Sequence, residues 1–266
     1  MFSYPFTYFS SIIGWRRPFT HRRLLSWFQL LFTSLFLIAL SLIPVALQNQ
    51  GLSNYPLTTF VENAFDPLTD EVMTDIATNV QISDRYLTYT GKQATHTSKA
   101  GRVILGHQDK LTTSADLTLY FDRDALHIRK DDTDLAIPYQ AVNQASLKDK
   151  ESLSTAISKD WFDQNRPTIS LFLILLAGGL MTINFLIVAF GASGFLYLTK
   201  RSRLFSFVTL KECYNFILNC LGLPTLLATL LGLLGQNFTT MITTQNILFV
   251  LYLVVIFYKT HFRDQD

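Results

Sequence analysis

Long apolar runs alternate with polar segments along the chain. Residues 24–47 and 169–198 contain no Asp, Glu, Lys, Arg or His. A helix of the first length rises about 36 Å, which is enough to cross a bilayer with some tilt. Two further apolar runs follow, the second of them weakened at its start by polar residues 243–246. We therefore expect four membrane-spanning helices, at residues 24–47, 168–198, 213–234 and 241–258.

Between the first two runs, the pattern becomes that of a separate folded domain. Apolar residues from Leu57 to Leu68 fall at offsets 0, 3, 4, 7, 8 and 11, which predicts an amphipathic helix. A second helical piece is expected through Val72 and Ile76. Short β-rich runs then alternate with polar turns. They occupy residues 86–90, 102–105, 117–121, 126–130 and 135–139.

Two local signals complete the predicted architecture of this domain. Asp122-Arg123-Asp124 separates two strand-like runs and is typical of a hairpin turn. Leu153, Ala156, Ile157 and Trp161 have the spacing of a helix that leads into the second span. The pattern favours a small antiparallel sheet with helices packed on one face.

Composition and charge orient these elements. The chain has 49% hydrophobic and only 16% charged residues, whereas soluble domains carry about a quarter charged. Residues 48–167 hold 17 acidic and 12 basic residues, a net −5, while the remainder holds 3 and 10, a net +7. This split does not fit a nucleic-acid-binding protein, whose bases gather on one domain surface.

The bases outside the domain flank the apolar runs, and Lys and Arg near helix ends stay in the cytosol. We therefore expect an integral membrane α-helical protein with four spans, both termini cytosolic, and an extracytoplasmic α+β domain at residues 48–167 that contains a small antiparallel sheet. Residues 1–23 are predicted to form a cytosolic or interfacial segment, although a frayed, partly inserted tail is the alternative. Residues 199–212 are a basic cytosolic loop, and residues 259–266 a cytosolic tail.

The spans carry small and amide side chains that favour close helix packing. The predicted packing positions are Gly178, Gly179, Asn184, Asn219, Pro224 and Gly232. We expect Gly178 and Gly179 to face the helix that carries Gly232. In the basic loop, Lys200, Arg201 and Arg203 are candidates for contact with anionic lipid or a cytosolic partner. The alternative for these three bases is a solvated loop.

Catalytic and metal-binding patterns are weak. Gly191-Ala192-Ser193-Gly194 matches the tetrapeptide of rhomboid intramembrane proteases, but no histidine lies in a predicted span to act as the base. Close helix packing explains these residues better, and an intramembrane serine protease is the remote alternative. His96, His107 and His127 match no metal-ligand spacing. Cys213 and Cys220 lie too far apart to form a disulfide. We predict no cofactor, no metal and no enzymatic activity.

Three segments give the chain a resemblance to a known family. They are the aromatic-rich start 2–17, the segment Leu126-His127-Ile128-Arg129 followed by Ile137-Pro138-Tyr139, and the block from Phe207-Val208-Thr209-Leu210-Lys211 to Leu223-Pro224-Thr225. With these segments, nearly the whole chain resembles the maltodextrin-utilization membrane proteins (MalA type) of Gram-positive bacteria. The last block is more loosely similar to Yip1-type membrane domains.

This resemblance implies a non-enzymatic accessory or regulatory component in maltodextrin uptake and utilization. The expected partners are the lipid bilayer and maltodextrin ABC transporter subunits or other membrane proteins. The alternative is a membrane sensor whose outer domain recognises a ligand or protein. Tyr86, Tyr89, Tyr120 and Tyr139 could stack on sugar rings, although tyrosines at this spacing are more often part of a sheet core.

Overall fold

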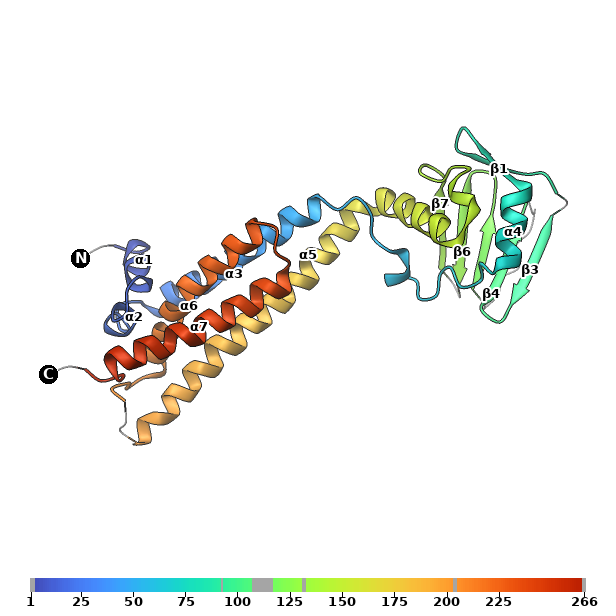
Figure 1. Ribbon diagram of the computed structural model, residues 1–266. Helices are drawn as coiled ribbons and strands as arrows, with labels where there is room; N and C mark the ends of the chain where they lie inside the picture. Colours follow the sequence, from blue (N-terminus) through green and yellow to red (C-terminus); the bar gives the residue numbers. More distant parts are fainter. Residues whose placement is uncertain (1–2, 92, 107–116, 131–132, 203–204, 265–266) are drawn as a thin grey trace. The chain divides into compact units, whose positions relative to one another are not determined.

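The computed structural model describes residues 3–91, 93–106, 117–130, 133–202 and 205–264. The chain folds into two compact units, drawn in Figure 1. The first unit comprises Met1–Gly51 and Ser170–Asp266, and the second comprises Leu52–Ile169. Helix α5 (Lys150–Leu198) contributes residues to both units.

The first unit is a bundle of apolar helices. The helices that complete it are α1 (Phe6–Ile12), α2 (Arg17–Thr20), α3 (Trp27–Gln50), the 3-10 turn η3 (Thr199–Ser202), α6 (Leu210–Leu233) and α7 (Phe238–Thr260). Helices α3, α5, α6 and α7 are each long and apolar enough to cross a membrane. The expectation of four such helices is therefore confirmed.

Side-chain caps set where these helices begin. Ser26 and Gln29 form a reciprocal capping box at the start of α3, which satisfies two backbone N–H groups that lack a helical partner. Thr209 accepts a hydrogen bond from the Glu212 backbone N–H, so α6 begins at Leu210, ahead of the apolar run that predicted it. Asn237 caps α7 in the same way.

Helix α6 forms the centre of the first unit. In its most apolar stretch 67% of residues are buried, against 22% to 39% for the other three long helices. It packs against α3 and α7, and the short helices α1 and α2 lie against it as well. The exposed apolar faces of α3, α5 and α7 have the character of helix surfaces that contact lipid.

The second unit combines two sheets with helices. Its helices are η1 (Leu57–Thr59), α4 (Asp70–Asn79), η2 (Ser146–Lys148) and the first part of α5. Strands β1 (Val80–Ser83) and β2 (Tyr86–Tyr89) form an antiparallel pair. The larger sheet has the order β3 (Ala94–Ser98), β4 (Gly101–Leu105), β5 (Thr118–Phe121), β6 (Ala125–Lys130) and β7 (Thr133–Pro138).

The hairpin predicted at Asp122-Arg123-Asp124 is confirmed, because it joins β5 to β6 with Phe121 opposite Leu126. Most neighbours in the larger sheet are antiparallel, as expected. Strands β4 and β5 are instead parallel, a pairing that needs a crossover rather than a tight turn. The sequence prediction also missed β1 and β3, which are short and carry few large apolar residues.

The predicted helix over residues 57–68 is wrong. Only η1 is helical there, and Asn63 has a φ of +60°, which an α-helix does not allow. The rest of the segment consists mainly of turns. Leu57, Ala64 and Leu68 are nevertheless buried at 0%, 0% and 2% exposure. The apolar spacing therefore reflects burial, not helical geometry.

The second unit has its own apolar core. Both faces of β5 are buried, since Leu119 and Phe121 point to one side and Thr118 and Tyr120 to the other. Helix α4 is amphipathic and buries Val72, Met73 and Ile76. From α5 the core receives Leu153, Ile157 and Phe162, each fully buried.

Candidate functional site

The N-terminal segment is docked on the centre of the helix bundle. The Tyr8 hydroxyl donates to the Leu218 carbonyl of α6 at 3.1 Å. The Tyr252 hydroxyl of α7 lies 2.8 Å from the Ile12 and Gly14 carbonyls, to which it donates. Each of these bonds satisfies a backbone carbonyl at a helix surface or a chain turn. The segment is thus packed on the bundle, not frayed.

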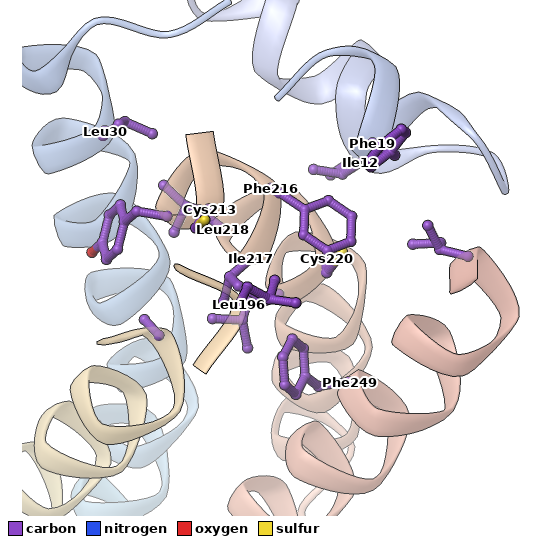
Figure 2. Packing of buried hydrophobic residues seen from close by; sticks show 14 of the residues in the cluster. Ile12, Phe19, Leu30, Leu196, Cys213, Phe216, Ile217, Leu218, Cys220 and Phe249 are labelled. Atoms are coloured by element: carbon purple, nitrogen blue, oxygen red, sulfur yellow. The ribbon is translucent and has the colours of Figure 1, made fainter. Parts of the chain in front are cut away.

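One of the predicted packing residues, Asn219, takes part in this docking. Its Nδ2 donates to the Pro18 carbonyl at 3.1 Å, inside the core. On the same surface, Phe19 packs edge-on against Phe216 of α6, with ring centroids 6.0 Å apart. Figure 2 shows Ile12 and Phe19 next to Phe216 and Cys220. The hydrogen bond of Asn219 therefore goes to the N-terminal segment and not to another long helix.

Small residues let the helices approach one another. A Cβ on Gly222 would lie 2.5 Å from both Ile12 Cγ2 and Tyr8 Oη, so only glycine fits beneath α1. A Cβ on Gly232 would come closer than 3.0 Å to Pro44 of α3 and to Met241 of α7. Close approach of this kind is what small residues provide in helix packing.

The other predicted packing positions have different surroundings. A Cβ on Gly178 would meet Leu42 of α3 at 3.0 Å, whereas one on Gly179 would meet no atom within 4 Å. The atoms nearest to Gly178 thus belong to α3 and not to Gly232. The neighbouring residues Ala177 and Met181 pack with Ala228 of α6 instead.

The amide of Asn184 bridges two long helices. It exchanges hydrogen bonds with Asn246 of α7, with Nδ2 to Oδ1 distances of 3.4 and 3.0 Å. Pro224 is buried within α6 and lines an apolar cavity together with Trp15. Ser193 is fully buried, and its hydroxyl donates to the Ala189 carbonyl one turn earlier in α5. The Ser193 hydroxyl is therefore hydrogen-bonded to the backbone of its own helix.

Part of the basic loop can be located. Lys200 is exposed, with its Nζ 5.8 Å from the Tyr197 ring centroid. The side chain of Arg201 and the whole of Arg203 lie outside the described residues, as does His107. Within the described part of the chain, no three His, Cys, Asp or Glu side chains gather as a metal site would require. Cys213 and Cys220 are free and buried.

A cavity of about 280 Å³ lies on the second unit and is lined by apolar, aromatic and charged residues. Phe60 exposes 40% of its surface there, and its ring centroid is 5.0 Å from that of Trp161. Glu62 and Lys130 bring opposite charges to the same cavity. An aromatic face beside a few polar groups is the usual lining of a small-molecule pocket. Sequence reasoning missed this site because it treated Phe60 as part of a helix.

The tyrosines considered for sugar stacking are distributed differently. Tyr120 and Tyr139 are buried at 2% and 1% exposure, so they belong to the core. Tyr86 is exposed, and the Arg123 guanidinium lies 5.2 Å from its ring centroid. None of these three lines the Phe60 cavity.

Asp75 is the centre of a polar cluster in the second unit. Its carboxylate accepts hydrogen bonds from His96 at 2.8 Å, Asn79 at 2.7 Å and the Tyr89 hydroxyl at 3.2 Å. Burial alone raises the pKa of Asp75, but the bonds from Asn79, His96 and Tyr89 outweigh it and lower the pKa below its usual 3.8. The cluster ties α4 to β2 and β3.

Comparisons with known proteins agree with the resemblance in the sequence. The model of the DUF1189 family, described as a protein of unknown function, matches residues 26–258. The Maltodextrose utilization protein MalA of Streptococcus pneumoniae (strain ATCC BAA-255 / R6) is 56% identical over 100% of this chain and 99% of its own length. YvdJ of Bacillus subtilis (strain 168), whose name also refers to maltodextrin utilization, is 23% identical over 82% of this chain and 76% of its own length. No solved structure matches.

Proposed function

The chain belongs to the DUF1189 family, and from that membership we propose that it is a non-enzymatic accessory or regulatory protein of maltodextrin uptake and utilization. The observation that carries the proposal is the 56% identity, over the full chain, to a maltodextrose utilization protein. The bundle supports it, because its long helices offer exposed apolar faces on which other membrane proteins can pack.

We also propose the orientation of the protein in the membrane. The four long helices span it, both termini are cytosolic, and residues 48–167 are extracytoplasmic. The distribution of charge supports this, since the bases outside that segment flank the helices at one side. The proposed partners are the bilayer and the membrane subunits of a maltodextrin ABC transporter.

Purification from mild detergent tests the proposed role. The tagged protein is isolated from cells grown on maltodextrin, and the co-purifying proteins are quantified against an unrelated four-span protein. We expect enrichment of maltodextrin transporter subunits, and slower growth of a deletion strain on maltodextrin but not on glucose. Absence of both effects would reject the role.

The Phe60 cavity favours a second candidate, a sensor whose second unit binds a sugar. The Phe60 ring could stack on one face of a glucose ring, and Glu62 and Lys130 could form hydrogen bonds with its hydroxyls. Titration of maltotetraose into the full-length protein in detergent tests this by calorimetry. Phe60→Ala should weaken binding about threefold to tenfold, since an aromatic contact contributes about 0.5–1.5 kcal/mol beyond the area it buries, whereas Tyr86→Ala outside the cavity should not. No heat at millimolar sugar would exclude direct sensing.

A further inference from the structure

Bases from the two ends of the chain line one cavity of the first unit. The cavity has a volume of about 320 Å³ and lies where α2 approaches the end of α7. Its charged residues are Arg16, Arg22, Arg23, Lys259, Arg263 and Asp264. Five cations and one carboxylate therefore share this wall, and one of the cations, Arg23, is also paired with Glu212 at 2.9 Å. If these bases served only to orient the helices, they would not need to lie close together, and each could be solvated separately.

Arg22 shows that the cavity is built and is not merely a charged surface. Its side chain is 3% exposed, and its Cζ lies 4.2 Å from the Phe19 ring centroid. Nη1 donates to the Phe19 carbonyl at 3.1 Å, and Nη2 donates to the Asp264 carboxylate at 2.8 Å. Its Nε is buried and has no hydrogen-bond partner among the described residues. The buried and hydrogen-bonded guanidinium of Arg22 therefore holds one positive charge at a fixed place in the cavity wall.

A second, apolar cavity lies along the same face of α7 as Lys259. It measures about 230 Å³, and its lining includes Trp15, the residue before Arg16. On α7 it is lined by Leu248, Tyr252 and Val255. These positions and Lys259 are spaced 4, 3 and 4 residues apart, so they lie along one face of the helix. Tyr252 and Lys259 are seven residues apart, about 10 Å along the axis.

We propose that these two cavities together bind one anionic phospholipid, with its phosphate against the bases and an acyl chain along α7 and Trp15. The basic cavity alone would also suit a soluble phosphate ester. The nearby apolar cavity favours a lipid, because a soluble ester would make no favourable contact with its nearly nonpolar wall. The proposal does not depend on any role in maltodextrin utilization.

Fluorescence quenching of Trp15 tests this assignment. Trp27→Phe and Trp161→Phe leave Trp15 as the only tryptophan of the full-length protein, which is placed in phosphatidylcholine nanodiscs. Bromine is carried on the acyl chains of either added phosphatidylglycerol or an equal amount of phosphatidylcholine. We expect brominated phosphatidylglycerol to quench Trp15 at a lower mole fraction. Equal quenching by the two lipids would overturn the proposal.

Variants distinguish binding in the cavity from a general attraction between basic residues and anionic lipid. Lys259→Gln should raise the phosphatidylglycerol fraction needed for half-quenching about fivefold, the effect of one base near a membrane surface. Lys200→Gln removes the same charge outside the cavity, and because Lys200 is itself a candidate for general contact with anionic lipid, it should shift the midpoint less than Lys259→Gln. An unchanged midpoint in Lys259→Gln would reject the site. If millimolar glycerol 3-phosphate binds the protein in phosphatidylcholine nanodiscs while phosphatidylglycerol quenches Trp15 no better than phosphatidylcholine does, the basic cavity binds soluble phosphate esters and the lipid assignment is wrong.

Discussion

Asn215 and Asn219 lie one helical turn apart on α6, and their amides have different surroundings. Both side chains are 0% exposed. Asn219 donates to the Pro18 carbonyl through Nδ2 and leaves only its Oδ1 without a partner, whereas neither amide atom of Asn215 has a hydrogen-bond partner among the described residues. A buried amide without a partner costs about 1–3 kcal/mol, so these two residues should respond in opposite ways to the same substitution.

The first prediction compares Asn215→Leu with Asn219→Leu. Asn215→Leu should leave the stability unchanged or raise it, because it removes an unpaired polar group and keeps the branched shape of the side chain. Asn219→Leu should lower it by about 1–2 kcal/mol, because the Pro18 carbonyl loses its donor. Thermal unfolding in detergent measures both. A loss of equal size in the two variants would contradict the assignment of partners.

The second prediction concerns the pH dependence of Asp75. Its pKa is lowered in the folded protein, so its contribution is present above the usual pKa of 3.8 and is lost as pH falls through the folded value. Asp75→Asn should therefore cost about 1–2 kcal/mol at neutral pH and less near pH 3. Urea unfolding followed by near-ultraviolet circular dichroism tests this. Asp66→Asn, at an exposed carboxylate of the same unit, should cost little at either pH.

At the scale of elements, uninterrupted apolar runs were the most informative signal. A span of about 20 apolar residues has few alternatives to a helix, so α3, α5, α6 and α7 could be predicted. Short segments were harder, because tertiary packing decides them. Residues 57–68 have helical spacing but bury their apolar side chains through turns, and Asn63 adopts a left-handed conformation.

The candidate sites depend on contacts that no local pattern contains. The basic cavity joins residues 16–23 to residues 259–264, and each group alone resembles an ordinary cytosolic flank. The Phe60 cavity joins the segment after η1 to β6 and β7. By contrast, the sequence could predict that small residues pack helices closely. It could not predict which residues Gly178 and Gly232 would contact.

The third prediction tests the docking of α1 on α6. Gly222→Leu should displace α1, because even a Cβ there would overlap Ile12 and Tyr8. Trypsin should then cleave after Arg16 at least several-fold faster, while the long helices remain folded by circular dichroism. Gly179→Leu is the matched control, since a Cβ at that position meets nothing within 4 Å. Equal protection of the two variants would show that α1 does not need this contact.

At the scale of the whole molecule, the proposed orientation makes a fourth prediction. Lys99→Cys lies in the second unit and should react with a membrane-impermeant maleimide on intact cells. Lys200→Cys lies beyond the end of α5 and should react only after the cells are permeabilised. Cys213 and Cys220 are buried and should give little background. Labelling of Lys200→Cys on intact cells would reverse the proposed orientation.

The docked N-terminal segment also bears on the order of events during synthesis. Tyr8 and Leu218 are 210 residues apart in sequence, and Ile12 and Tyr252 are 240 apart. At a ribosomal rate of about 5–20 residues per second, the first helix waits roughly 10–50 s for its binding surface. During this interval Tyr8 lacks its partner on α6, whereas Phe9 can already contact Phe36 of α3. The complete seating of α1 is therefore a late step of assembly, and it can occur only in a chain that has been made through α7.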